Sequence, residues 1–175
     1  TVSKTVTYLH VRAISARATR GVLTCGSLVV PCALGRSGRL VLKREGDGGT
    51  PVGFWLLRRI YYRGDRLIRP LSKIPASPIK GGWGWCETVG DGNYNRRVDL
   101  PYPAAHEDLK RPDHLYDIVV ETSHNQRPRI QGRGSAIFFH LARENFAPTA
   151  GCIAVTLKDM QKVLRHCSAR TRLVI

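Results

Sequence analysis

The stretch from residue 135 to residue 155, SAIFFHLARENFAPTAGCIAV, constrains the fold of this chain more than any other. Two apolar runs within it, Ala136–Phe139 and Ile153–Val155, have the composition of short buried β-strands. The first run ends at His140, and Cys152 directly precedes the second. The pattern therefore predicts two core strands, joined by one loop, that bring an imidazole and a thiol to their ends.

A thiol delivered beside an imidazole is a candidate nucleophile. The thiolate is the reactive form of cysteine, and a nearby imidazole can take the proton of the thiol. Gly151 permits a positive φ or a close backbone approach, and Thr149 places a hydroxyl three residues before the sulfur. A cysteine or histidine alone is more often a structural residue of the core. The combination of hydroxyl, glycine and thiol after a strand-terminal histidine favours catalysis by Cys152 and His140.

These motifs resemble those of a known family. Phe139-His140, followed by T-A-G-C-I at residues 149–153, is similar to the L,D-transpeptidase (YkuD-type) catalytic domain, in which a histidine precedes a Ser/Thr-x-Gly-Cys-Ile/Val segment. Upstream, K-R-E-G-D-G-G-T-P-V-G at residues 43–53 resembles that family's K-x-G-x-x-x-T-P-x-G element. Both motifs occur in the expected order, and the resemblance spans the chain from about Leu23 to Ile175.

The chain departs from the family pattern at two positions. Leu141 follows the histidine where the family usually has glycine, and Ala154 follows G-C-I where it usually has arginine. The loop from His140 to Cys152 is also shorter than usual. The chain therefore resembles a divergent branch with T-A-G-C-I-A in place of S-x-G-C-I-R. We expect Arg143 to replace the missing arginine in substrate binding.

The resemblance implies a cysteine acyltransferase that acts on peptidoglycan. Cys152 would attack the carbonyl of the third, diamino-acid residue of a tetrapeptide stem and expel the terminal D-alanine. The thioester would then pass to an amine, giving a 3-3 crosslink or attaching another molecule. His140 would activate the thiol and protonate the leaving amine. Backbone N–H groups of Gly151 and Cys152, together with Thr149, would hold the oxyanion.

The resemblance also sets expectations for partners and location. It implies peptidoglycan stem peptides as partners, carbapenems as covalent inhibitors, a periplasmic or cell-envelope location, and no metal or organic cofactor. The chain begins at Thr1 and shows no signal-peptide pattern. No apolar run approaches the roughly 20 residues needed to span a bilayer, so no membrane span is expected.

Two alternatives remain open at this point. The same fold could hydrolyse peptidoglycan-linked peptides as an L,D-carboxypeptidase or amidase, because the sequence does not show whether water reaches the thioester. In another class of function, the net charge of +15 suits a non-catalytic module that binds nucleic acid or a wall polymer. The basic residues lack the motifs of nucleic-acid-binding folds, so we expect no nucleic acid. Anionic envelope polymers suit the charge equally well.

The five cysteines limit other kinds of site. They contain no C-x-x-C spacing, which disfavours structural zinc, and we expect no metal. Cys25 and Cys32 flank an expected hairpin, and only the geometry of the hairpin decides whether they form a disulfide.

The length of 175 residues fits one domain, residues 1–175. Short apolar runs with a turn every eight to twelve residues predict a mainly β fold, an L,D-transpeptidase-like β-sandwich or barrel. Strands besides the two above are expected at residues 5–12, 21–24, 28–30, 40–42, 54–62, 118–120 and 173–175.

A C-terminal amphipathic helix is expected after Thr156, which is a candidate N-cap with Asp159 three residues later. Its apolar face is expected to comprise Leu157, Met160, Val163, Leu164 and Cys167.

Three further segments complete the expected site. Residues 43–53 are expected to form a wall of the cleft, and residues 70–97 a long ordered loop that covers or lines it. A short helix is expected at residues 104–110, ended by Pro112. It carries His106, a candidate group beside the site.

Overall fold

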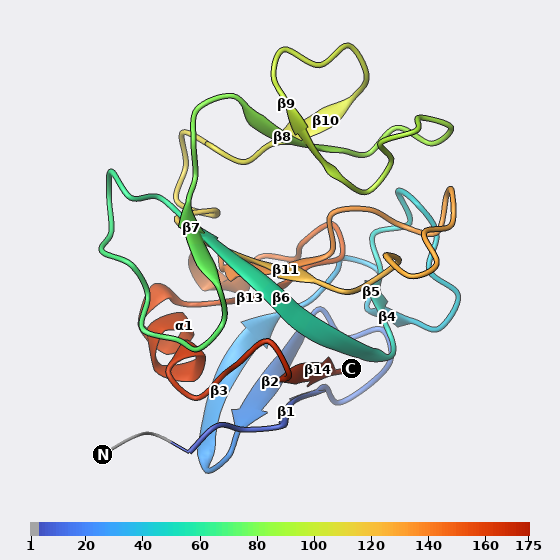
Figure 1. Ribbon diagram of the computed structural model, residues 1–175. Helices are drawn as coiled ribbons and strands as arrows, with labels where there is room; N and C mark the ends of the chain where they lie inside the picture. Colours follow the sequence, from blue (N-terminus) through green and yellow to red (C-terminus); the bar gives the residue numbers. More distant parts are fainter. Residues whose placement is uncertain (1–3) are drawn as a thin grey trace.

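The computed structural model describes residues 4–175, and one curved sheet dominates it (Figure 1). Its strands are β1 Tyr8–Arg12, β2 Arg20–Cys25, β3 Leu28–Ala33, β6 Phe54–Tyr62, β7 Ala76–Pro78, β11 Ile118–Thr122, β12 Phe138–Leu141, β13 Ile153–Val155 and β14 Arg172–Val174. They lie in the order β11-β12-β13-β3-β2-β1-β14-β6-β7. A further pairing of β11 with β6 closes the first eight into a ring. The expected β-barrel architecture is therefore confirmed.

The two terminal strands lie side by side within the ring. β1 pairs with β14 in parallel, with Tyr8 opposite Arg172 and Leu9 opposite Leu173, and on its other side β1 pairs with β2 in the antiparallel sense. Alternate residues of each ring strand point inward, because successive side chains of a strand lie on opposite faces. The interior is filled by apolar side chains that include Leu9, Leu23, Leu57, Ile60, Phe139 and Ile153.

The helix α1, Leu157–Leu164, forms where the sequence predicts it. Thr156 is its N-cap, and its hydroxyl accepts a hydrogen bond from the backbone N–H of Asp159 at 3.2 Å. Met160, Val163 and Leu164 are buried against the main core, as is Cys167 beyond the helix. Amphipathic packing therefore holds α1 against the ring. A 3-10 turn, η1 Glu144–Phe146, lies in the loop before β13.

A second, three-stranded sheet lies above the ring in the view of Figure 1. It consists of β8 Trp83–Cys86, β9 Arg97–Asp99 and β10 His106–Asp108, in the order β10-β8-β9. A short pairing of β4 Arg39–Leu40 with β5 Thr50–Pro51 lies elsewhere. Between the small sheet and the outer face of the ring lies a second apolar cluster: Tyr61, Ile79, Trp85, Leu109, Tyr116, Val119, Ala136, Phe138 and Cys152.

Two expected elements are wrong. The helix expected at residues 104–110 is instead strand β10, because β8 supplies a partner for its backbone and pairs His106 with Cys86. The strand expected at residues 40–42 ends at Leu40, and Val41 and Leu42 are exposed. In the first case strand pairing outweighs the local helical pattern, and in the second the apolar residues lie at the surface and not in a strand.

Two further expectations concern residues 70–97 and the pair Cys25 and Cys32. Residues 70–97 contain β7 and β8, so they are not one irregular loop, although they do cover the outer face of the ring. The hairpin register sets Cys25 opposite Leu28 and Cys32 opposite Gly21. Four strand residues, about 13 Å, therefore separate the two cysteines, which is too far for a disulfide. All five cysteines are free.

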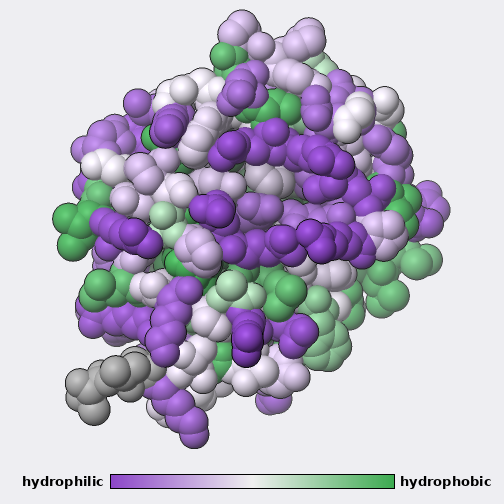
Figure 2. Space-filling view, viewed as in Figure 1, coloured by the Kyte–Doolittle hydropathy of each residue, from purple (hydrophilic) through white to green (hydrophobic). Residues whose placement is uncertain are grey.

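Hydrophilic side chains cover much of the face shown in Figure 2, and smaller apolar areas lie between them. Over residues 4–175, no helix has the length and apolar character needed to cross a membrane.

Asn95 ties the small sheet to the ring. Its side chain is 2% exposed, and its Oδ1 accepts hydrogen bonds from Trp85 Nε1 at 2.9 Å and Ala136 N at 3.1 Å. Its Nδ2 donates to the carbonyls of His124 and Asn125. One buried amide therefore joins β8 to the segment that leads into β12.

We predict that Asn95→Ala lowers the free energy of unfolding by about 2 kcal/mol or more, since it leaves buried N–H groups of Trp85 and Ala136 without acceptors. Urea denaturation measures this. Asn93→Ala, at an exposed side chain of the same segment, is the control and should change stability by only about 0.5 kcal/mol. Equal effects of the two substitutions would contradict the assignment.

Candidate active site

The pairing of β12 with β13 places the two predicted catalytic residues on one face. The strands are parallel, with Phe139 opposite Ile153 and His140 opposite Ala154. Because side chains alternate along a strand, Cys152 lies on the same face as Ala154 and therefore as His140. Phe139 and Ile153 point into the ring, so His140 and Cys152 point outward, toward the small sheet.

Two small cavities meet at Cys152. One, of about 100 Å³, is lined by Cys152 and His140 together with Glu107, Arg111, Leu115, Tyr116, Arg143, Ala147, Thr149 and Ala150. The other, of about 180 Å³, is lined by Cys152 with Arg36, Lys43, Glu45, Gly46, Glu87, Glu107, Ser135, Ala136, Ile137 and Ala150. Cys152 and His140 are 8% and 6% exposed. The sulfur therefore stands at the boundary of two sheltered spaces.

The thiol is held by backbone groups. Cys152 Sγ donates to the carbonyl of Ala136 at 3.2 Å, and the backbone N–H of Phe138 donates to the sulfur at 3.3 Å. Among the hydrogen bonds of the described residues, none joins Sγ to the His140 ring, although the two groups share a cavity. The two side chains therefore share a cavity in this structure without a direct hydrogen bond between them. Ala136, which holds the thiol, has a φ of 51°, an unusual value for a residue other than glycine.

The His140 ring is oriented by its own strand. Nδ1 lies 2.8 Å from the carbonyl oxygen of Leu141, a contact that requires Nδ1 to carry the proton. Nε2 is then the unprotonated nitrogen of the neutral ring, the form that can accept a proton. The ring also packs edge-on against Tyr116, with centroids 5.3 Å apart. A carbonyl therefore does the orienting that a carboxylate does in other cysteine sites.

Burial keeps both groups neutral at rest. Burial, together with the nearby Glu107 carboxylate, raises the pKa of the Cys152 thiol to about 12, against the opposing effect of the Phe138 N–H. Burial, which outweighs the opposing hydrogen bond to the Leu141 carbonyl and is aided by the guanidinium groups of Arg111 and Arg143, lowers the pKa of His140 to about 4. Both shifts favour the neutral thiol and the neutral imidazole over a thiolate–imidazolium pair.

Thr149 and Gly151 shape the turn that presents the sulfur. Thr149 Oγ1 donates to the carbonyl of Cys152 at 2.6 Å and accepts from the Gly151 N–H at 3.1 Å. Gly151 has a φ of 142°, and a Cβ there would lie 2.8 Å from the carbonyl oxygen of Gly49. The turn therefore requires glycine at residue 151, and the structure gives the Thr149 hydroxyl a role in closing the turn.

Residues 43–53 form a wall of the site, as expected. Lys43 lines the larger cavity and pairs with Asp47, which also accepts from the backbone N–H groups of Arg44 and Gly49. Burial opposes ionisation of Asp47, but the Lys43 ammonium and these N–H groups hold its pKa below the ordinary value. The ion pair therefore stabilises the loop at residues 43–53. The Gly49 carbonyl of this loop lies close to Gly151, in the turn before Cys152.

Arginines reach the smaller cavity from two places. Arg143 lines it, at the position where we expected a replacement for the family arginine. Ala154, which occupies the family's arginine position, is fully buried opposite Ala33 of β3. Arg111 also lines the cavity, stacks over Tyr116 at 5.2 Å, and pairs with Asp113.

Sequence reasoning missed Glu107, Arg111 and Tyr116 as residues of the site. It considered His106, the neighbour of Glu107, but His106 does not line either cavity, and its Nδ1 lies 2.8 Å from the carbonyl of Ala104. Because the segment is a strand and not a helix, Glu107 and His106 point to opposite faces. A correct assignment of β10 would have exposed this alternation.

A comparison of the chain with models of protein families identifies the L,D-transpeptidase catalytic domain (YkuD), which matches residues 16–175. The chain belongs to this family. Searches of curated proteins and of solved structures found no match. Family membership confirms the resemblance that the His140 and T-A-G-C motifs indicated, and with it the mainly β fold.

Leu141 stands where we expected glycine after the histidine. The carbonyl of residue 141 orients the histidine, and a backbone carbonyl is available from leucine as from glycine.

The described residues contain no group of three or more histidine, cysteine, aspartate or glutamate side chains arranged to hold a metal ion.

We predict that Gly151→Ala destabilises the protein well beyond the effect of a positive φ alone, because the new Cβ would meet the Gly49 carbonyl. Gly90→Ala is the matched control: Gly90 has a φ of 93° with open space around it. The control should cost about 1–2 kcal/mol in urea denaturation. A Gly151→Ala cost no larger than that of the control would contradict the close approach.

We predict that the free energy of unfolding falls as the pH falls from about 6.5 toward 4. The pKa values of His124 and His140 are about 4 in the folded protein, below the ordinary value of 6.5. The unfolded chain therefore binds more protons in this range, at up to about 1.4 kcal/mol per pH unit for each histidine. His124→Phe should make the dependence shallower, and an unchanged slope in urea titrations would contradict this.

Proposed function

We propose that this member of the L,D-transpeptidase family is a peptidoglycan acyltransferase with Cys152 as nucleophile and His140 as base. The observation that carries the proposal is that thiol and imidazole share one cavity, on one face of two paired strands, with Nδ1 engaged and Nε2 left as the proton acceptor. Membership in a peptidoglycan enzyme family supports the substrate class.

The acylation step follows from these groups. As the stem peptide binds, the Cys152 thiol passes its proton to His140 Nε2, and the sulfur attacks the carbonyl carbon of the third, diamino-acid residue. The tetrahedral intermediate collapses, the bond to the terminal D-alanine breaks, and the imidazolium returns its proton to the leaving amine. A Cys152 thioester and free D-alanine result.

The resting neutral pair suits this sequence of events. An ionised pair in the buried cavity would be costly before substrate arrives. Substrate that fills the cavity brings a carbonyl on which negative charge develops, and the imidazolium then gains a counter-charge. We propose the Cys152 N–H as a donor to that oxyanion, with Gly151 and Thr149 holding the turn in place.

Charged side chains in the cavity favour an anionic donor substrate. Arg143 and Arg111 line the space shared by His140 and Cys152. We propose that Arg143 binds a carboxylate of the stem peptide, since a planar guanidinium pairs well with carboxylates. Loss of this charge would then raise KM more than it lowers kcat.

We propose that the second cavity admits the acyl acceptor. Cys152 lines both cavities, so an acceptor amine can reach the thioester from the larger one while the smaller one holds the acyl chain. The amine attacks the thioester carbonyl, loses a proton to His140, and the thiol is regenerated. The product is a 3-3 crosslink or a stem peptide joined to another amine.

The proposal extends to the cellular location of the enzyme and to its inhibition. An enzyme of this substrate class works at the cell envelope, and we propose the periplasm. A carbapenem presents a strained carbonyl to the same thiol and is expected to leave a covalent adduct on Cys152.

The test is to incubate the protein with purified tetrapeptide muropeptides and follow the products by mass spectrometry. We expect release of D-alanine with crosslinked dimers. Cys152→Ala should remove activity entirely, and His140→Gln should lower kcat by about 10²–10⁴-fold. Cys86→Ala, at a buried cysteine outside both cavities, should retain activity.

The same assay separates the alternatives. Tripeptides without dimers, even when amine acceptor is in excess, would mean that the enzyme is a carboxypeptidase. No product and no carbapenem adduct on the folded protein would overturn the catalytic proposal and favour a non-catalytic binding module.

A further inference from the structure

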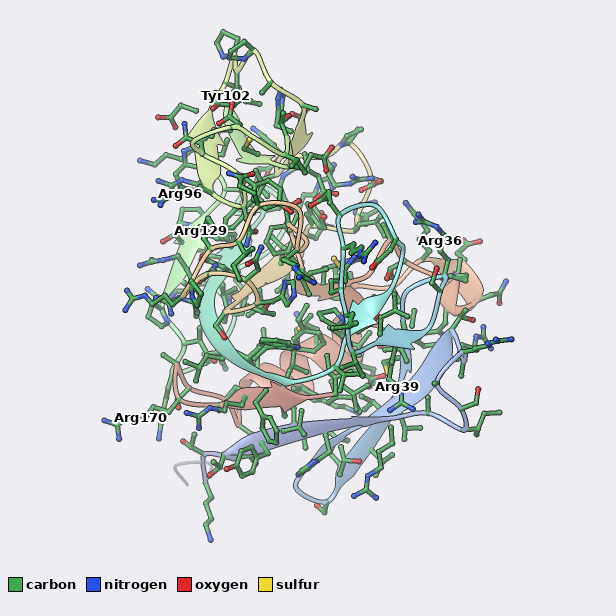
Figure 3. The ribbon with its side chains drawn as sticks, turned by 90° about the vertical axis from the view of Figure 1, so that its right-hand side faces the viewer. Arg36, Arg39, Arg96, Tyr102, Arg129 and Arg170 are labelled. Atoms are coloured by element: carbon green, nitrogen blue, oxygen red, sulfur yellow. The ribbon has the colours of Figure 1, made fainter. Side chains whose placement is uncertain are left out.

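A hollow rich in arginine lies on the side of the molecule formed by β6, β9 and the loop after β11. It has a volume of about 590 Å³, and its walls comprise Arg59, Tyr61, Trp85, Asn95, Arg96, Arg97, Glu121 and Arg129. We call it the arginine hollow. Figure 3 shows Arg96 and Arg129 near one another at the same edge of the molecule. None of its residues lines the cavities at Cys152.

The arginines of the hollow lack anionic partners. Four guanidinium groups face one carboxylate, Glu121, which already accepts hydrogen bonds from Tyr61 and Gln126. No ion pair within residues 4–175 involves Arg59, Arg96, Arg97 or Arg129. Elsewhere in the chain Arg63, Arg66 and Arg111 pair with aspartates.

Like charges in the hollow repel one another. Burial lowers the pKa of Arg129, and the guanidinium groups of Arg96 and Arg58 also lower it, with Glu121 opposing them only in part. A fold that gathers four guanidinium groups around a single carboxylate loses some stability, and a bound anion would offset the repulsion. The repulsion therefore points to a ligand that carries negative charge.

Neutral contacts hold these side chains in place before any ligand binds. Arg129 Nε donates to the carbonyl of Asn95 at 3.2 Å, and Arg59 Nη1 donates to Ser77 Oγ at 3.1 Å. Arg97 stacks over the Trp83 ring at 4.1 Å. Pre-positioned guanidinium groups lose less conformational freedom when they bind an anion.

The chemistry of the hollow selects among anions. Every cation in it is arginine, whose planar fork matches phosphate oxygens in a bidentate manner. Four such groups exceed the charge of a single carboxylate, which favours a ligand with several negative charges. The aromatic rings are not free to stack on nucleic-acid bases, because Tyr61 and Trp85 are buried and Arg97 covers Trp83.

We propose that the arginine hollow is a binding site for a ligand bearing several phosphate groups and recognised through those groups, not through bases. The site is separate from the proposed reaction at Cys152 and would serve to hold the protein on a phosphate-bearing polymer. Binding of phosphate groups at the arginine hollow does not depend on whether Cys152 is catalytic.

The test uses inorganic tripolyphosphate as the probe, with affinity measured by calorimetry at about 0.15 M salt. At that ionic strength, attraction between exposed charges is largely screened beyond about 8 Å, so the diffuse effect of the net charge is reduced. Arg96→Gln/Arg129→Gln should weaken binding at least about tenfold. Arg96→Lys/Arg129→Lys keeps the positive charge but loses the planar guanidinium groups. Its affinity for tripolyphosphate should lie between those of the double Gln variant and the parent.

The matched control is Arg69→Gln/Arg170→Gln, which removes the same charge from two exposed arginines outside the hollow. It should change the affinity less than about twofold. Equal weakening by both Gln pairs would overturn the proposal, because binding would then follow net charge alone. A single-stranded oligonucleotide with the same number of phosphates that binds the parent more tightly than tripolyphosphate would also overturn it.

Discussion

The parallel pairing of β12 with β13 is the constraint on which the proposed active site depends. It sets His140 opposite Ala154 and thereby puts the imidazole on the face that also carries Cys152. A shift of one residue in that register would turn one of the two groups into the apolar interior. The small sheet above then shelters both side chains, while Asn95 holds that sheet to the segment before β12.

Shelter and reactivity oppose each other at this site. The burial that excludes water also raises the pKa of the thiol and lowers that of the imidazole. The structure keeps the site polar by lining it with carboxylates and guanidinium groups, including Glu107 and Arg143. The charged groups that line the cavities therefore also affect how readily the proton can leave the sulfur.

Much of this could be predicted from the sequence, for identifiable reasons. The strand at residues 54–62 and the helix after Thr156 have strong local patterns, and both form at the expected places. The T-A-G-C motif identified the family because its residues are adjacent in the chain. Residues 104–110 were mistaken for a helix, since the strand forms only because a partner strand lies beside it. Glu107 and Arg111 reach the cavity through that long-range pairing, which no local pattern records.

The adjacency of the first and last strands has a mechanical consequence. β1 and β14 are parallel neighbours, with His10 opposite Val174, so their free ends lie at opposite ends of the pair. A pulling force applied between the two termini would slide one strand along the other and strain all the ladder hydrogen bonds at once, whereas an antiparallel hairpin would open one bond at a time. Tension between the ends of these two strands therefore loads their pairing in shear.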